Sequence, residues 1–315
     1  MRLQVLDIDG SVTLQKQLRI GYRSSVIPLR EWGPSLRLAC GFRRFRRFES
    51  ALTRSLSSVD HENTVRLLGS GDFHHVTLAL LRRLTTPINL LVIDNHPDWM
   101  RGVPFLHCGT WLYHAAQLPQ VIRVFHVGGD VDFDNYYRFM APWPLLRSGK
   151  LSVKPAVRRF TRGAWAGISN EPIRLEGEES GIDAEEPNLE RIAEIVRPFQ
   201  DELARRPLYI SLDKDVMLSK HAHVNWDSGH LTLAEVQATL AAFIEAAAGR
   251  LAGMDIVGDW SRVETQGTLR RAMHLTMHPA LSVDAAEARV RNEATNLKIL
   301  AVVERALAQS WKQTA

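Results

Sequence analysis

The feature that most constrains the fold is a set of apolar, β-branched runs, each followed at once by polar or acidic residues. The runs are TVRLL at 64–68, INLLVI at 88–93, VIRVFHV at 121–127, LYISL at 208–212 and GMDIV at 253–257. Helical stretches lie between them, a pattern typical of an α/β protein with a buried parallel sheet. Because ligand sites in such sheets lie at the carboxyl ends of the strands, we expect the polar segments to converge on one crevice.

Three other segments carry helix signals. Thr232-Leu-Ala-Glu235 is a capping box ahead of apolar residues at helical spacing, and the stretch 284–308 has the pattern of a long amphipathic helix. In GFRRFRRFES at 41–50, phenylalanines recur at a near-helical interval and leave the arginines mainly on the other side. This spacing predicts an amphipathic helix at the surface.

The region at about 142–187 differs from the rest of the chain. It is rich in glycine, proline and charge, with a strand pair expected around 151–165 and an acidic loop, EGEESGIDAEE. It holds too few apolar residues for a core of its own. We therefore expect an inserted segment within a single domain that spans residues 1–315.

Composition excludes several classes of protein. Hydrophobic residues make up 45% of the chain and charged residues 23%, which argues against disorder and against a coiled coil. No apolar run approaches the roughly 20 residues of a membrane-spanning helix, and the N-terminal MRLQVLDIDG carries acid where a signal peptide is apolar. The only two cysteines are Cys40 and Cys108, which suits a reducing compartment. We expect a soluble, cytoplasmic protein with no membrane partner.

The charge pattern argues against a nucleic-acid partner. The net charge of +4 is mild, and the arginine clusters lack the long basic stripe and recognisable motif of a nucleic-acid-binding protein. The arginines are interpreted as a solvated face, and the expected partner is a small-molecule substrate.

The strongest candidate site is DNHPD at 94–98. In extended backbone, residues two apart point to the same side, so Asp94, His96 and Asp98 can share a metal ion. Two carboxylates with the same spacing, Asp213 and Asp215, follow another predicted strand. A histidine at position 74 or 75, after GSGD, adds a second imidazole.

So many carboxylates in one crevice require cations, because uncompensated negative charges raise one another's pKa values. A site rich in oxygen with a few imidazoles favours Mn²⁺, whereas zinc more often takes nitrogen and sulfur ligands. The sequence therefore predicts a manganese site.

These segments resemble the ureohydrolase family of arginase, agmatinase and formimidoylglutamase, whose pattern is GGDH, then DxHxD, then SxDxD. Here the segments are GSGDFHH at 69–75, DNHPDW at 94–99 and SLDKD at 211–215. The resemblance implies an arginase-like, three-layer α/β/α fold with a mainly parallel central sheet. It also implies two Mn²⁺ ions per chain and a possible homo-oligomer.

The resemblance further implies a ligand set in which Asp94 and Asp213 bridge the two ions. The implied metal ligands are His74, Asp94, His96, Asp98, Asp213 and Asp215. The family places its histidine directly after the Asp, whereas Phe73 intervenes here, so His75 is the alternative to His74.

Two other segments are similar to family motifs. LHCGTW at 106–111 matches a segment that carries a proton-shuttling histidine, which implies this role for His107. VGGDVD at 127–132 is similar to a segment that contacts the amino end of the substrate, which implies substrate contacts for Asp130 and Asp132.

The sequence departs from the family where the substrate's guanidinium group would bind. Gly258 stands where the family has a glutamate, and Asp259 is one residue out of register. A guanidinium requires a carboxylate opposite its N–H groups, so Asp259 is the candidate substrate-binding acid. Lys214, inside the DxD motif, is expected to point away from the metals by strand alternation.

The expected chemistry follows from two adjacent cations, which lower the pKa of a bridging water enough to supply hydroxide near neutral pH. The hydroxide would attack an sp² carbon, and His107 would protonate the leaving nitrogen or shuttle protons. We expect a Mn²⁺-dependent hydrolase of a linear amidine or guanidino-type C–N bond. The alternatives are a related metal-dependent amide deacylase, which needs no guanidinium partner, and a catalytically silent metal-binding regulatory protein.

Overall fold

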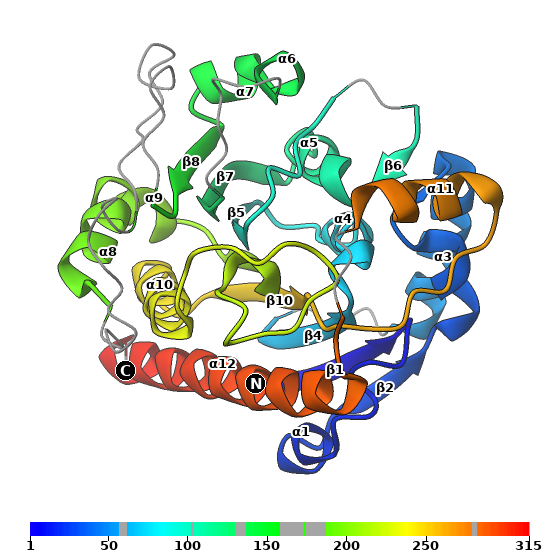
Figure 1. Ribbon diagram of the computed structural model, residues 1–315. Helices are drawn as coiled ribbons and strands as arrows, with labels where there is room; N and C mark the ends of the chain where they lie inside the picture. Colours follow the sequence, from blue (N-terminus) through cyan, green and yellow to red (C-terminus); the bar gives the residue numbers. More distant parts are fainter. Residues whose placement is uncertain are drawn as a thin grey trace.

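The computed structural model describes residues 1–56, 62–101, 104–129, 137–157, 173, 187–278 and 282–314. At its centre is an eight-stranded sheet with the order β2-β1-β4-β10-β9-β5-β7-β8, in which every described pairing is parallel (Figure 1). Its strands are β1 (Arg2–Asp7), β2 (Ser25–Pro28), β4 (Thr64–Gly69), β5 (Ile88–Asp94), β7 (Val121–Gly128), β8 (Leu151–Pro155), β9 (Leu208–Asp213) and β10 (Leu251–Val257). A separate antiparallel pair joins β3 (Ala39–Cys40) to β6 (Leu106–His107).

The apolar runs predicted as strands are β4, β5, β7, β9 and β10, and they occupy adjacent positions in the middle of the sheet. These strands are apolar throughout because both of their faces are buried. In β5, Leu90 and Val92 pack into the core on one face of the sheet, and Leu91 and Ile93 pack into the core on the other face. A strand that is buried on both faces needs apolar residues at every position. The continuous apolar runs in the sequence therefore predicted the central strands.

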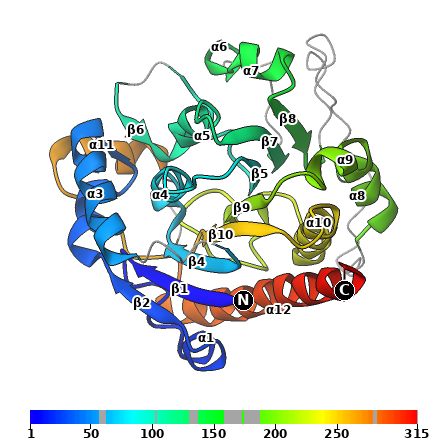
Figure 2. The same cartoon turned by 180° about the vertical axis from the view of Figure 1, so that it is seen from behind.

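Helices cover both faces of the sheet and produce three layers, as predicted (Figures 1 and 2). One face carries α3 (Phe42–Ser55), α4 (Val76–Leu81), α5 (Trp111–Ala115) and α7 (Trp143–Arg147). The opposite face carries α1 (Lys16–Gly21), α8 (Leu189–Val196), α9 (Gln200–Leu203), α10 (Leu233–Ala246) and α12 (Ala285–Thr314). The remaining helices are α2 (Gly33–Leu36), α6 (Tyr137–Met140) and α11 (Thr268–Met277). None of the helices in the described part of the chain combines the length and apolar character needed to cross a bilayer.

The helix signals of the sequence are confirmed. The Thr232 hydroxyl accepts a hydrogen bond from the Glu235 N–H at 3.2 Å, and the Glu235 carboxylate accepts one from the Thr232 N–H at 2.7 Å, so the capping box begins α10. The predicted helix at 284–308 is α12. On α3, Phe45 and Phe48 are buried against the sheet.

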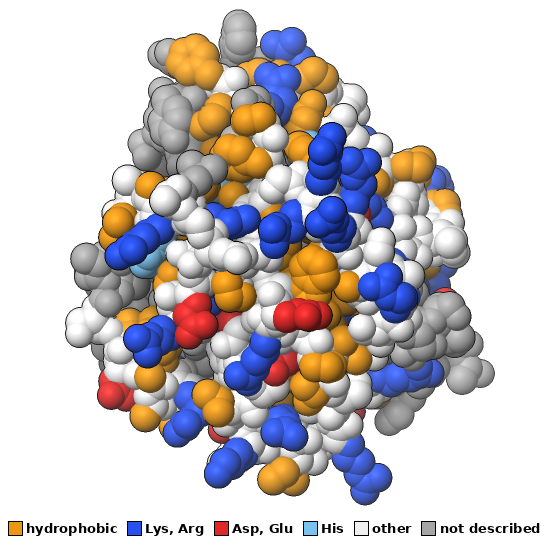
Figure 3. Space-filling view, turned by 90° about the vertical axis from the view of Figure 1, so that its right-hand side faces the viewer, with side chains coloured by type: hydrophobic (Ala, Val, Ile, Leu, Met, Phe, Trp, Pro, Cys, Tyr) orange, Lys and Arg blue, Asp and Glu red, His pale blue; other side chains and the backbone are white. Residues whose placement is uncertain are grey.

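The arginines of α3 are exposed, as predicted for the outer side of an amphipathic helix. Arg43, Arg44, Arg46 and Arg47 all lie on the solvent side of α3. Figure 3 shows the face of the molecule that carries this helix, where Lys and Arg side chains gather with apolar side chains between them.

The region around 142–187 is described only in part. Leu151–Pro155 is a strand, as predicted, and as β8 it extends the central sheet, parallel to β7; the second half of the expected strand pair lies outside the described residues. The segments 158–172 and 174–186, which include the acidic loop, lie outside the described residues. The insertion and the single domain stay predictions.

The burial of α3 yields a stability prediction. Phe48 is fully buried, so Phe48→Ala should lower the free energy of unfolding by about 3–5 kcal/mol, measured by urea denaturation. The neighbouring Arg47→Ala, on the exposed side, should change it by less than about 0.5 kcal/mol. Equal urea midpoints for the two variants would contradict this packing of α3.

Candidate metal centre

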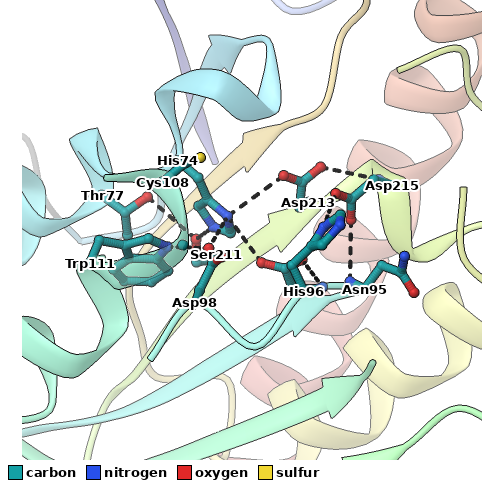
Figure 4. A network of polar contacts seen from close by, with 12 residues as sticks. His74, Thr77, Asn95, His96, Asp98, Cys108, Trp111, Ser211, Asp213 and Asp215 are labelled. Atoms are coloured by element: carbon teal, nitrogen blue, oxygen red, sulfur yellow. Dashed lines mark hydrogen bonds and ion pairs between the residues drawn. The ribbon is translucent and has the colours of Figure 1, made fainter. Parts of the chain in front are cut away.

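The predicted ligands meet at the carboxyl ends of three strands (Figure 4). Asp94 and Asp213 are the last residues of β5 and β9, which are neighbours in the sheet. Asp215 lies in a short 3₁₀ turn, η6 (Lys214–Val216), directly after β9. His74 follows a similar turn, η2 (Gly71–Phe73), after β4. Three of the five segments expected to converge, those after β4, β5 and β9, therefore place their polar side chains in one crevice.

A first group of ligand atoms surrounds His74. Its Nδ1 lies 3.1 Å from Oδ2 of Asp94, 3.0 Å from Oδ2 of Asp98 and 3.6 Å from Oδ2 of Asp213. All four side chains are almost completely buried. The spacing of His74, Asp94 and Asp98 suits a single metal ion.

A second group surrounds His96. Its Nδ1 lies 2.9 Å from Oδ2 of Asp215 and 3.9 Å from Oδ1 of Asp94. Asp94, His96 and Asp215 also have the spacing of a metal site. Asp94 thus belongs to both groups and turns one oxygen toward each, the arrangement expected of a bridging carboxylate.

The structure distinguishes His74 from His75. His74 faces the carboxylates, whereas the His75 ring packs 6.1 Å from the ring of Phe45, and neither of its nitrogens has a hydrogen-bond partner among the described residues. Burial lowers the pKa of His75 to about 3, so this ring is neutral. Of the two alternatives left open by the sequence, His74 is the one placed to bind a metal.

The charges of the site fit divalent cations. Burial together with the neighbouring Asp215 and Asp94 raises the pKa of Asp213, and burial together with Asp94 raises that of Asp215. A cation coordinated by these buried carboxylate oxygens would compensate their negative charges and remove this electrostatic cost.

Without a cation, the histidines compensate the carboxylates. Burial alone would lower the pKa of His74, but its hydrogen bonds to Asp94 and Asp98 raise the pKa well above its usual value. Likewise, burial opposes protonation of His96, but the charge and hydrogen bond of Asp215 raise its pKa to about 10. Both rings are therefore protonated at neutral pH when no metal is bound.

A second layer of polar contacts orients His74. The Ser211 hydroxyl donates to Oδ1 of Asp255 at 2.8 Å, so it accepts the hydrogen bond from His74 Nε2 at 2.9 Å. Asp255 is itself held by Thr77 and Tyr209, each at 2.9 Å. This chain fixes the proton on Nε2 and leaves Nδ1 to face the carboxylates.

Asp98 is held in an unusual backbone conformation. Its φ of +47° lies in the left-handed region, which few residues other than glycine, asparagine and aspartate adopt. Its Oδ2 accepts a hydrogen bond of 2.5 Å from Nε1 of Trp111, a residue that is itself fully buried. Local strain and a buried partner direct this carboxylate toward His74.

A cavity of about 80 Å³ opens over the carboxylates. Besides the six candidate ligands, its walls include Pro97, Met100, His107, Cys108, Trp226 and Met277. Nδ1 of His107 accepts a hydrogen bond of 2.9 Å from the Gly109 N–H, so the proton of the neutral ring is on Nε2. Burial lowers the pKa of His107 to about 4, which keeps the ring neutral at pH 7.

Asp72 organises a part of the site that the sequence analysis did not assign. Its Oδ2 accepts a hydrogen bond from Arg37 at 2.6 Å, and its Oδ1 accepts from Trp226 at 3.0 Å and contacts His278 Nε2 at 2.7 Å. Trp226 in turn packs its ring 5.4 Å from that of His96. The partners are 35 to 206 residues away from Asp72 in sequence, so no local motif could have grouped them.

Of the three predicted substrate-binding acids, the structure describes only Asp259. Asp130 and Asp132 lie outside the described residues. Asp259 does not line the cavity: its carboxylate is 2.9 Å from Nζ of Lys214 and accepts a hydrogen bond from Gln15 at 2.6 Å. Lys214 points away from the candidate ligands, as strand alternation predicted. A substrate contact by Asp259 stays a prediction, and this arrangement does not favour it.

Solved structures of ureohydrolases share this fold at low sequence identity. The agmatine ureohydrolase of Thermoplasma volcanium is 14% identical, with a TM-score of 0.53 over 99% of this chain and 91% of that chain. The arginase of Helicobacter pylori is 15% identical, with a TM-score of 0.51 over 98% and 99%. The formimidoylglutamase of Bacillus subtilis is 15% identical, with a TM-score of 0.50 over 97% and 87%.

Sequence comparison adds little to this likeness. No family model matches the chain. An uncharacterized protein of Thermotoga maritima is 39% identical over 64 residues, which are 20% of this chain and 26% of that protein. The match thus spans about a quarter of the relative's length. The fold and the site together define a divergent protein of the ureohydrolase fold, with a buried His/Asp cluster suggestive of a metal centre.

The protonated histidines predict that metal binding releases protons. His74 and His96 must each lose a ring proton to bind a metal, so Mn²⁺ binding at pH 7 should release at least about two protons per chain, with any proton held by Asp213 or Asp215 in addition. The apparent affinity should therefore rise with pH between about 6 and 9. Calorimetric titration in buffers of different ionisation enthalpy measures both effects. His114→Gln, outside the site on α5, is the control and should leave the proton count unchanged.

Proposed function

We propose that this protein is a Mn²⁺-dependent hydrolase with a binuclear metal centre, which cleaves a linear amidine or guanidino-type C–N bond. The observation that carries the proposal is the pair of metal-sized groups that share Asp94 at the ends of neighbouring parallel strands. The donors are carboxylate oxygens and imidazole nitrogens with no thiolate among them, which favours Mn²⁺ over Zn²⁺.

The proposed ligands fall into two sets. His74, Asp98 and Asp94 would hold one ion and His96, Asp215 and Asp94 the other, with Asp213 beside the first set. When bound, such ions act as Lewis acids that activate water and polarise the group under attack.

The chain's own residues supply the remaining requirements. Pro97, Met100, Trp226 and Met277 form apolar walls around the cavity, which limit access of bulk water. At about 80 Å³ the cavity has room for only the reacting end of a substrate. His107 lies on the cavity wall and is neutral at pH 7, and its Nε2–H is the ring proton that it would donate to a leaving nitrogen before taking one back from solvent, in keeping with a proton-shuttling role.

Removal of single ligands tests the proposal. Asp98→Ala and Asp213→Ala should each abolish retention of Mn²⁺ and turnover together, because each removes a buried ligand oxygen. Metal content after gel filtration and metal-dependent release of product are measured on the same samples. Asp201→Ala, at the exposed start of α9, is the matched control and should keep both. Full metal content in either ligand variant would contradict the assignment.

A second candidate, a metal-dependent amide hydrolase, is favoured by one observation. Within the described residues, the acids on the cavity wall are the proposed metal ligands themselves, so no further carboxylate faces a substrate guanidinium. Gly258, where the family has a glutamate, cannot supply one, because a Cβ there would lie 2.5 Å from Oδ1 of Asp213. An amide is uncharged and needs no such partner.

A substrate panel separates the two candidates. With Mn²⁺ supplied, release of urea or ammonia from guanidino and formimino compounds would support the first candidate. Release of a carboxylate from small amides, with no reaction of the guanidino compounds, would support the second. Two bound Mn²⁺ ions with no turnover on the whole panel would instead indicate a metal-binding protein without catalytic activity.

A further inference from the structure

A buried ion pair lies directly behind the ligand turn. Lys214 stands between Asp213 and Asp215 but points away from the cavity, and its Nζ lies 2.9 Å from Oδ1 of Asp259. The Lys214 side chain is 0% exposed and that of Asp259 1% exposed. A lysine and an aspartate this deeply buried are rare unless each compensates the charge of the other.

Asp259 is anchored to parts of the chain that are remote from the turn. Oδ1 of Asp259 accepts hydrogen bonds from Gln15 Nε2 at 2.6 Å and from Asn296 Nδ2 at 3.3 Å. The Asn296 side chain, on α12, also donates to Oε1 of Gln15 at 2.9 Å. The pair therefore ties the ligand turn to α12 and to the segment before α1.

The absence of a side chain at Gly258 makes this pair possible. Gly258 has a φ of +88°, and a Cβ there would lie 2.7 Å from the backbone nitrogen of Lys214. The next residue, Asp259, donates its N–H to the carbonyl of Gly69 at 2.9 Å, at the end of β4. The loop after β10 thus packs directly on the ligand turn, and its first carboxylate is directed to Lys214.

We propose that Lys214 and Asp259 are a positioning pair that holds Asp213 and Asp215 in the geometry needed to bind metal. The proposal rests on the proposed function, because it assigns these aspartates as ligands. Lys214 is covalently adjacent to both, so an anchor on its Nζ limits how far the turn can shift. Residues that orient metal ligands typically change metal affinity 10- to 100-fold when they are replaced.

Mn²⁺ titration of the full-length protein tests the pair. Lys214→Met removes the anchor at similar side-chain length, and we expect its Kd for Mn²⁺ to rise at least about tenfold, measured from the EPR signal of free Mn²⁺. Leu240→Ala, in the buried core of α10, is the control for a merely structural effect. It should lower stability but leave the Kd within about twofold of the wild type.

A double variant keeps the test valid if Lys214→Met leaves Asp259 uncompensated and fails to fold. Lys214→Met/Asp259→Leu replaces the ion pair by apolar side chains, a change that buried pairs often tolerate. Its Kd should also rise at least about tenfold. Backbone hydrogen exchange at residues 213–217, measured without metal, should be faster in the variants than in the wild type, while Leu240→Ala should not selectively accelerate it.

The outcomes are distinct. Wild-type Mn²⁺ affinity in a folded variant that lacks the ion pair, with unchanged exchange at 213–217, would overturn the positioning role and leave the proposed function intact. A wild-type protein that binds no Mn²⁺ would remove the proposed function, and the positioning proposal with it.

Discussion

Electrostatic repulsion among buried carboxylates is the constraint on which the site depends. The site holds four aspartates that lie close together and are almost completely buried: Asp94, Asp98, Asp213 and Asp215. Such a cluster is stable only when positive charge is supplied. The metal-free chain supplies it by protonating His74 and His96, and divalent ions would supply it more completely. The repulsion between these carboxylates destabilises the metal-free site, and the same negative charges favour the binding of cations.

The parallel sheet is the scaffold that brings these charges together. Strands that are buried on both faces are rigid and end at a common edge, so short polar segments after β4, β5 and β9 meet without long loops. Around the candidate ligands lies a layer of buried polar side chains, among them Ser211, Asp255 and Trp111. This layer directs ring nitrogens and carboxylate oxygens inward, as metal sites require.

The departure from the ureohydrolase pattern has a structural explanation. The Asp259 carboxylate faces Lys214 and does not line the cavity. Gly258 allows the loop after β10 to approach Asp213 closely, and Asp259 compensates the charge of Lys214. The same local arrangement therefore compensates the lysine inside the DxD motif and, within the described part of the chain, turns Asp259 away from the cavity wall.

The sequence by itself determined the central strands, the capped helix α10 and the ligand spacing of DNHPD and DKD, because these depend on local periodicity. It did not reveal β1 or β2, which lie toward one edge of the sheet and are short or mixed in polarity, and it predicted a strand in the region of β8 without showing that this strand joins the central sheet. Only the tertiary structure decided that His74 rather than His75 faces the carboxylates, that Asp72 joins Arg37 to His278, and that Asp259 turns toward Lys214. These outcomes depend on how turns pack against distant elements, and the spacing of residues along one segment carries no information about that packing.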